Sequence, residues 1–228
     1  MKIKILISLA FFSLAACTDN SSIPLKLKVT GGLIEGSEEG DLKKYLGVPY
    51  AAPPINELRW APTQQLEGWT DVLLAKTNSK ICYQPKQMAE FYDRGPDLDD
   101  MSEDCLTLNV WTRADKSNEK LPVMVWFHGG ALVWGSGSEY SGAELTKQGV
   151  ILVTVNYRLG PFGFFSHPEL SEETGTSGNQ GFKDQIKSLE WVKQNIHKFG
   201  GDPNNVTIFG ESAGSWSVNV LQASPLSR

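Results

Sequence analysis

One segment constrains the fold more than any other: a short strand that runs into a glycine-flanked serine and then into a helix. Residues 206–209 (VTIF) have the composition of a buried strand, Gly210-Glu211-Ser212-Ala213-Gly214 follows at once, and residues 215–221 have a helical pattern. A sharp turn between strand and helix needs small residues around the serine, because Cβ atoms there would collide with the neighbouring backbone. The G-x-S-x-G pattern alone is weak, but this context predicts a nucleophile elbow with Ser212 as the nucleophile.

A second turn supplies the groups that such a serine requires. Residues 121–127 (LPVMVWF) predict a buried strand that ends in His128-Gly129-Gly130-Ala131, the glycine-rich type of loop that lipases and esterases use. A serine nucleophile needs N–H donors for the oxyanion that forms on the attacked carbonyl. We expect the N–H of Ala213, directly after the serine, to be one donor and the loop that begins at His128 to supply the others. The alternative is that this loop is only a flexible turn.

The remaining pattern indicates an α/β protein. Strands are expected at residues 27–29, 44–48, 105–112 and 150–155, and one helix at about 179–198. That helix carries an apolar stripe at helical spacing, formed by Phe182, Ile186, Leu189, Val192, Ile196 and Phe199. Strands that alternate with helices through long connections predict a mainly parallel sheet flanked by helices.

Composition excludes several functional classes. The 228 residues are 40% hydrophobic and 21% charged, which is typical of a globular domain. The formal net charge of −5 lacks the basic footprint of a nucleic-acid-binding protein, so no nucleic-acid partner is expected. The acidic run near Asp104 lacks the spacing of a metal site, and the predicted chemistry requires no cofactor.

The N-terminus indicates export. A basic start with Lys2 and Lys4 precedes an uncharged, mostly apolar stretch, residues 5–16, which is too short to span a bilayer. The stretch ends Leu-Ala-Ala before Cys17, a pattern that resembles the lipobox of bacterial lipoproteins. We therefore expect a signal peptide at residues 1–16, lipidation of Cys17, a tether at 17–26 and a domain at 27–228. This predicts an outer-membrane lipoprotein of the bacterial envelope, held to the membrane by its lipid anchor only. The alternative is an ordinary cleaved signal on a periplasmic or secreted protein.

Export also bears on the other cysteines. Cys82 and Cys105 are the two that remain beside Cys17, and disulfides persist in exported proteins. We expect a disulfide between them, with two buried thiols as the alternative.

Longer stretches of the chain resemble one family. They are LGVPYAAPP, SEDCLTLNVWT, VMVWFHGGALVWGSGS, VTVNYRLGPFGFFS and GNQGFKDQIKSLEWVKQNIHKFGGDPNNVTIFGESAGSWSV. From about Gly31 to Arg228 the chain resembles the type-B carboxylesterases, the cholinesterase-like branch of the α/β-hydrolases. The resemblance implies hydrolysis of a small-molecule ester through an acyl-enzyme on Ser212, with Gly130, Ala131 and Ala213 as the donors to the oxyanion. It also implies the Cys82–Cys105 disulfide and two ion pairs, Arg59–Glu103 and Arg158–Asp184.

The resemblance also indicates which catalytic residues are missing from this sequence. Members of the family carry the acid and the histidine of the catalytic triad well beyond the serine, whereas here sixteen residues follow Ser212 and all three histidines precede it. We therefore expect the chain as given to be the N-terminal part of an esterase, truncated after the elbow. A non-catalytic cholinesterase-like binding module and an inert fragment are the alternatives. The acyl and alcohol groups of the substrate and the oligomeric state do not follow from the sequence.

Overall fold

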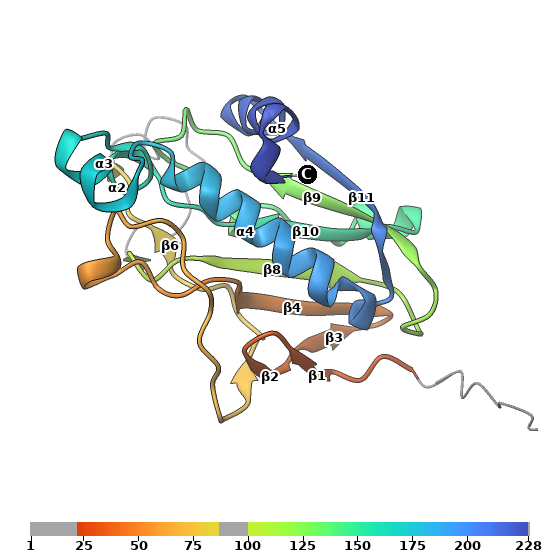
Figure 1. Cartoon of the computed structure of the whole chain (residues 1–228). Helices are drawn as coiled ribbons and strands as arrows, with labels where there is room; N and C mark the ends of the chain where they lie inside the picture. Colours follow the sequence, from red (N-terminus) through yellow and green to blue (C-terminus); the bar gives the residue numbers. More distant parts are fainter. Residues whose placement is uncertain (1–21, 87–99, 228) are drawn as a thin grey trace, which may run out of the picture.

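A six-stranded sheet forms the centre of the computed structural model, which describes residues 22–86 and 100–227 (Figure 1). Its strand order is β11-β9-β10-β8-β4-β3, and two smaller sheets, β1-β2-β5 and β6-β7, lie beside it. The strands are β1 (Lys26–Val29), β2 (Gly32–Glu35), β3 (Ser37–Glu39), β4 (Leu42–Pro49), β5 (Leu73–Leu74), β6 (Ile81–Cys82), β7 (Met101–Ser102), β8 (Thr107–Thr112), β9 (Leu121–Phe127), β10 (Ile151–Val155) and β11 (Gly201–Gly210). The helices are α2 (Gly160–Phe164), α3 (Pro168–Thr174), α4 (Gln180–Asn195) and α5 (Ala213–Ala223), with 3₁₀ turns η1 (Asn56–Leu58), η2 (Gly137–Glu139), η3 (Leu145–Gln148), η4 (Ile196–Phe199) and η5 (Pro225–Ser227).

The main sheet is mixed, which corrects the expectation of a mainly parallel one. β11 with β9 and β9 with β10 are parallel pairs, whereas β10 with β8, β8 with β4 and β4 with β3 are antiparallel. The sequence pattern indicates how deeply a strand is buried. A strand buried on both faces has the same apolar pattern whether it runs parallel or antiparallel to its neighbours. The parallel half nevertheless contains the two strands that lead to the predicted site.

The folded part of the chain starts before the expected boundary at residue 27. Ile23 is buried at 4% exposure and its N–H donates to the carbonyl of Asp115 at 2.7 Å. Residues 22–26 therefore pack against the domain and do not form a free tether. The expected signal peptide and Cys17 lie outside the described residues.

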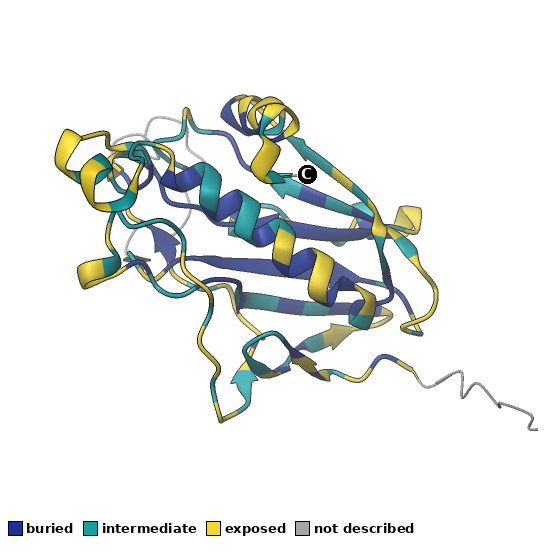
Figure 2. Ribbon diagram, viewed as in Figure 1, coloured by how far each residue is buried: buried dark blue, intermediate teal, exposed yellow. Residues whose placement is uncertain are grey.

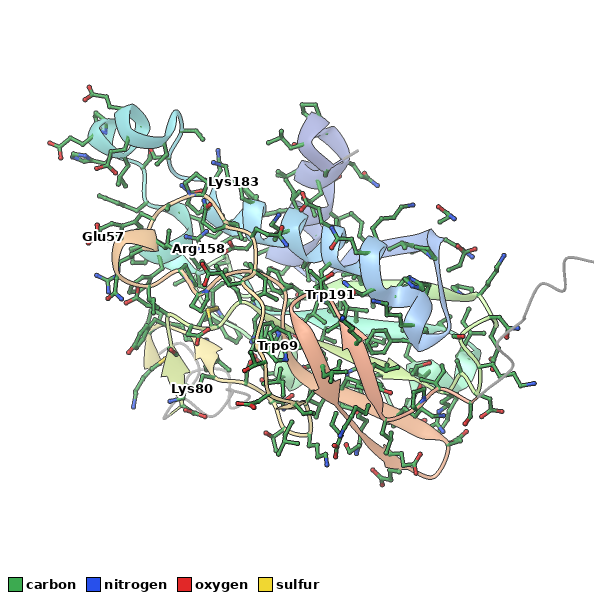
Figure 3. The ribbon with its side chains drawn as sticks, turned by 60° about the horizontal axis from the view of Figure 1, so that its bottom comes forward. Glu57, Trp69, Lys80, Arg158, Lys183 and Trp191 are labelled. Carbon is green, nitrogen blue, oxygen red and sulfur yellow. A yellow bond between two sulfur atoms is a disulfide. The ribbon has the colours of Figure 1, made fainter. Side chains whose placement is uncertain are left out.

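Helix α4 crosses one face of the main sheet, and α5 lies beside the end of β11 (Figure 1). Between the helices and the sheet lies the principal core, in which alternate residues of β9 and β10 are fully buried (Figure 2). Trp191 projects from α4 into this core, 5.9 Å from the ring of Phe199 (Figure 3). The opposite face of the sheet carries a smaller cluster around Trp111 and Leu152. None of the described helices is long and apolar enough to cross a membrane.

The buried face of α4 is offset from the predicted apolar stripe. Val192 is buried as expected, but Ile186 and Leu189 are only partly buried. Their places in the interior are taken by Asp184 and Gln185, which are fully buried. Buried polar side chains are tolerated when each is hydrogen-bonded, and Gln185 donates to the Ser217 hydroxyl at 2.9 Å.

Arg158 supplies the partner that Asp184 needs. Its guanidinium donates to both carboxylate oxygens of Asp184 at 2.9 and 2.8 Å, and both side chains are nearly inaccessible to solvent. Arg158 also donates to the carbonyl of Ala61 at 3.0 Å, and Thr63 donates to Asp184. This ion pair therefore joins the segment after β10, helix α4 and the proline-rich loop after β4.

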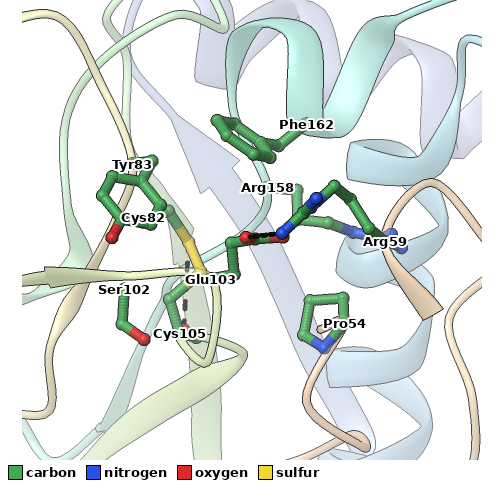
Figure 4. Close-up of a pocket in the computed structure, with 9 residues that line it drawn as sticks. All are labelled: Pro54, Arg59, Cys82, Tyr83, Ser102, Glu103, Cys105, Arg158 and Phe162. Atoms are coloured by element: carbon green, nitrogen blue, oxygen red, sulfur yellow. Dashed lines mark hydrogen bonds and ion pairs between the residues drawn. A yellow bond between two sulfur atoms is a disulfide. The ribbon is translucent and has the colours of Figure 1, made fainter. Parts of the chain in front are cut away.

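The second ion pair and the disulfide lie next to each other. Arg59 pairs with Glu103 in a bidentate arrangement, and Cys82 is bonded to Cys105 with Cα atoms 5.1 Å apart. A cavity of about 10 Å³ lies between them. Tyr83 is one of the residues that line it (Figure 4). This volume holds about one water molecule, so the cavity is too small for an organic substrate.

Among the described residues, β11 is an edge strand of the main sheet. A groove of about 600 Å³ runs along it between α4 and the C-terminal turn, lined on its apolar side by Ile186, Leu189, Ile208 and Leu226. Leu226 is 69% exposed and Trp216 on α5 is 63% exposed.

The buried ion pair makes a specific prediction for stability. Asp184→Ala leaves the Arg158 guanidinium buried without its counter-charge, so we expect the free energy of unfolding to fall by about 3–5 kcal/mol. Urea denaturation followed by circular dichroism measures the change. Glu144→Ala removes the partner of an exposed pair with Lys147 and serves as the control, with little expected change. Equal losses in the two variants would contradict the role given to Asp184.

Candidate active site at the carboxyl end of β9 and β11

The register of two parallel strands brings the predicted site together. Gly210 at the end of β11 pairs with Phe127 at the end of β9. Because the strands are parallel, the turns that follow them leave the sheet at the same edge. One turn carries Ser212 and the other begins at His128, so residues more than eighty positions apart in the sequence become neighbours.

The turn after β11 has the strained backbone of an elbow. Ser212 has φ 51° and ψ −116°, a conformation that L-residues rarely adopt, and it caps the N-terminus of α5. A Cβ atom on Gly214 would lie 2.0 Å from the carbonyl oxygen of Phe127, and one on Gly210 would lie 2.5 Å from the Gly214 carbonyl carbon. Both glycines are therefore required by space, which is the steric demand that predicts the G-x-S-x-G pattern.

The turn after β9 is equally tight. Gly130, Ala131 and Leu132 have consecutive positive φ angles of 95°, 55° and 63°. The carbonyl of Gly130 accepts hydrogen bonds from the N–H groups of Val133 and Trp134, so the turn closes on itself. A positive φ is costly for alanine and leucine, and strain of this kind is found at functional sites.

The two turns touch. A Cβ atom on Gly129 would lie 3.3 Å from Cβ of Ser212 and 2.3 Å from a carboxylate oxygen of Glu211. Glycine at this position thus lets the loop after β9 approach the elbow. The Glu211 side chain is exposed and lies over this contact.

The backbone N–H groups expected to face an oxyanion have no partner among the described residues. Within residues 22–86 and 100–227, the N–H groups of Gly130, Ala131 and Ala213 make no hydrogen bond to the protein. Ala213 is fully buried, and buried backbone N–H groups are nearly always paired. Unpaired N–H groups on both sides of an exposed serine are the arrangement that stabilises negative charge on a substrate oxygen.

His128 is part of the scaffold of the loop. Its ring is buried, stacks on Tyr157 at 4.4 Å, and its Nδ1 donates to the carbonyl of Gly129 at 2.9 Å. Burial lowers the pKa of His128 from 6.5 to about 4, although the hydrogen bond to Gly129 opposes the shift. No described residue pairs with its Nε2 atom, so His128 does not contact the Ser212 hydroxyl.

The other two histidines are also not placed as a base. His167 caps the N-terminus of α3, where its Nδ1 accepts from the N–H of Glu169. His197 lies in η4, which precedes β11, whereas Ser212 lies beyond the other end of that strand. The length of β11 therefore separates His197 from Ser212. Burial and the nearby Lys198 lower the pKa of His197. In the described part of the chain, no histidine hydrogen-bonds Ser212.

Several residues that hold the loop gave no signal in the sequence. Tyr157 donates through its hydroxyl to the carbonyl of His128 at 2.7 Å, and the N–H of Gly160 donates to the carbonyl of Leu132 at 2.7 Å. Gln84 hydrogen-bonds Gly135 at the far end of the loop. These contacts are long-range, and no local pattern or spacing predicts them.

The mixed sheet, the flanking helices and the elbow together define an α/β-hydrolase. The carboxylesterase family model matches residues 23–228, and the chain belongs to this family, the type-B carboxylesterases. It is 46% identical over 200 residues to the para-nitrobenzyl esterase of Bacillus subtilis (strain 168), covering 86% of this chain and 40% of that protein. It is 42% identical over 217 residues to the fumonisin B1 esterase of Sphingopyxis macrogoltabida, covering 93% of this chain and 39% of that protein.

A solved structure of a PNB esterase superimposes with a TM-score of 0.81 at 42% sequence identity, covering 89% of this chain and 41% of that one. The fold class expected from the sequence is thereby confirmed, with the strand directions of the sheet corrected from mainly parallel to mixed. The chain spans about two fifths of the length of these relatives.

The buried His128 predicts a dependence of stability on pH. Between pH 6.5 and about 4 the unfolded chain binds a proton at this residue and the folded chain does not, so stability falls as the pH falls through this window. The loss should reach about 3 kcal/mol near pH 4. His128→Phe keeps the stacked ring without titrating and should flatten that part of the profile.

Urea denaturation at half-unit pH steps measures this effect. His167→Asn, at an exposed position, is the matched control and should keep the slope of the parent. An unchanged slope in His128→Phe would show that the pKa of His128 is not lowered by burial.

Proposed function

We propose that this chain carries the nucleophile and the oxyanion hole of a serine esterase. The observation that carries the proposal is the position of Ser212 at a strained elbow, beside the unpaired N–H groups of Gly130, Ala131 and Ala213. Ester hydrolysis itself is supported by membership of the carboxylesterase family.

The geometry supports the following reaction. The Ser212 hydroxyl oxygen attacks the ester carbonyl carbon as its proton passes to the general base, and the carbonyl oxygen becomes an oxyanion held by the N–H groups. The C–O bond to the alcohol then breaks, and the alcohol leaves with the proton returned by the base. Water then attacks the acyl-enzyme and releases the acid. The reaction requires no cofactor and no metal, and the substrate is a small-molecule ester.

We also propose that these 228 residues do not contain the general base that would accept the proton of Ser212. His128 is buried against Tyr157 and neutral, and its Nε2 atom is not aimed at a partner among the described residues. We propose that the acid and the histidine of the triad lie outside this sequence. The reading frame beyond Arg228 is the direct test, and a late Glu or Asp followed by a His would support the proposal.

Two alternatives remain to be tested, a binding module without catalysis and an inert fragment. A binding module does not need the N–H groups of the loop unpaired or the serine at a strained φ. Both features are retained here, and this favours chemistry.

Ser212→Ala tests the nucleophile. In a chain extended past Arg228 by the rest of its gene, we expect the variant to lose hydrolysis of short p-nitrophenyl esters and covalent labelling by a fluorophosphonate. Residues 17–228 alone, which lack the base, should show turnover near background. Ser215→Ala, one turn further along α5, is the control and should retain labelling. Labelling of another serine, or turnover by residues 17–228 that depends on Ser212, would contradict this account.

We further propose that the protein is an exported lipoprotein with an oxidised Cys82–Cys105 pair. The proposal rests on the basic, apolar N-terminus, the small residues before Cys17, and the placement of Cys82 and Cys105 at bonding distance. Outer-membrane sorting is the expected destination.

Cys17→Ser tests the anchor. Stable membrane attachment needs several acyl chains, and bacterial lipoproteins carry these on the cysteine. The variant should therefore leave the membrane fraction or remain unprocessed. Palmitate should label the parent and should not label the variant. A variant that fractionates with membranes as the parent does, with no lipid on the parent, would rule out lipidation.

A further inference from the structure

The side chain of Gln84 holds the far end of the loop after β9, residues 128–135. The Oε1 atom of Gln84 accepts a hydrogen bond from the N–H of Gly135 at 2.8 Å, and its Nε2 atom donates to the carbonyl of Gly135 at 3.1 Å. Gln84 is 9% exposed and lies 51 positions away in the sequence. The side-chain amide therefore pairs with both polar groups of Gly135, as a neighbouring strand would do.

The other end of this contact is fixed. Nε2 of Gln84 also donates to the carbonyl of Cys82 at 3.1 Å, and Cys82 is bonded to Cys105. The disulfide at Cys82 restrains the backbone two residues before Gln84. Gln84 therefore has little freedom to follow the loop if the loop moves. The disulfide and Gln84 thus form one rigid support.

Gly135 transmits this support to the oxyanion donors. A Cβ atom on Gly135 would lie 2.4 Å from Nδ1 of His128 and 3.0 Å from the carbonyl oxygen of Gly129. Gly135 is therefore packed against the first residues of the loop, while Gln84 holds its polar groups. In addition, a Cβ atom on Gly130 would lie 2.0 Å from the carbonyl oxygen of Trp134. Movement at residues 134–135 must displace the backbone at residues 128–130.

The loop needs such support because its conformation is strained. Three consecutive positive φ angles, at Gly130, Ala131 and Leu132, persist only where the surroundings determine them. Stabilisation of an oxyanion requires donors that are already in place before the reaction.

We propose that Gln84 is a positioning residue for the oxyanion hole, acting through Gly135 on the N–H groups of Gly130 and Ala131. This inference rests on the proposed function, since it gives Gln84 a part in the hydrolysis of esters by Ser212. Only an uncharged amide of this length offers an acceptor and two donors, so neither glutamate nor methionine can replace the contacts.

The test compares Gln84→Glu and Gln84→Met with the parent, using the protein expressed from its own gene. Glutamate keeps the shape but places a carboxylate against two carbonyl oxygens, and methionine removes all three hydrogen bonds without adding charge. Gln180→Glu is the matched control. Gln180 is buried at 2% exposure and its Nε2 atom also donates to a backbone carbonyl, that of Trp60 at 2.7 Å. Among the described residues, no hydrogen bond joins Gln180 to the loop.

Two measurements separate positioning from stability. Hydrogen–deuterium exchange should become at least about tenfold faster in peptides covering residues 128–135 of both Gln84 variants, and stay unchanged there in Gln180→Glu. In steady-state kinetics, kcat should fall about 10- to 100-fold with KM nearly constant, less than the 10²- to 10³-fold lost with a whole oxyanion donor. Affinity for a trifluoromethyl ketone, which mimics the tetrahedral intermediate, should fall by the same factor as kcat/KM.

The outcomes are distinguishable. Exchange at residues 128–135 that does not change in either Gln84 variant would overturn the inference while leaving the proposed function intact. Faster exchange with an unchanged kcat would also overturn it, because the support would then have no catalytic effect. Retained hydrolysis in Ser212→Ala would instead refute the proposed function, and the exchange data would still decide whether Gln84 holds the loop. A Gln84→Glu variant that fails to fold leaves the uncharged Gln84→Met to decide the question.

Discussion

The parallel pairing of β9 with β11 is the constraint on which the site depends. Pairing of Gly210 with Phe127 places the ends of both strands at one edge of the sheet. The two turns that follow these strands therefore lie side by side and pack against each other. The glycines at positions 129, 210 and 214 are consequences of this register. Gly129 lies against the elbow, and Gly210 and Gly214 lie against Phe127 at the end of β9. A shift of either strand by one residue would separate Ser212 from its N–H donors.

A strained site of this kind requires rigid surroundings, and the structure supplies them from several directions. Tyr157 holds the start of the loop, Gly160 its middle and Gln84 its end. The segment after β10 that contains Tyr157 and Gly160 is itself fixed by the buried pair of Arg158 and Asp184. Buried ion pairs contribute little net stability but fix geometry, which is the property that the proposed catalysis needs.

The sequence predicted the parts of the molecule that local patterns encode. The limits of β9 agree with the apolar run from which they were predicted, and β10 differs by one residue. The elbow was predicted because its glycines and small residues answer a local steric demand. The helix α4 was found, but its buried face was predicted only in part, because the apolar period does not reveal that Asp184 and Gln185 have buried partners.

Other features depend on contacts that no short pattern contains. Strand direction was misjudged because burial looks alike in parallel and antiparallel strands. Ile23 was assigned to a tether because a single apolar residue has no period. Gln84 gave no signal, since its importance arises from Gly135, which the fold alone brings near.

The central claim is that β9 and β11 together place three backbone N–H groups around Ser212. The most direct test is a crystal structure of the protein after reaction with a fluorophosphonate, in which the phosphonyl oxygen marks the position of the oxyanion. The account predicts that the phosphorus is bonded to Ser212 and that its oxygen lies about 3 Å from the nitrogens of Gly130, Ala131 and Ala213. An adduct on another serine, or an oxygen directed away from these nitrogens toward solvent, would contradict it.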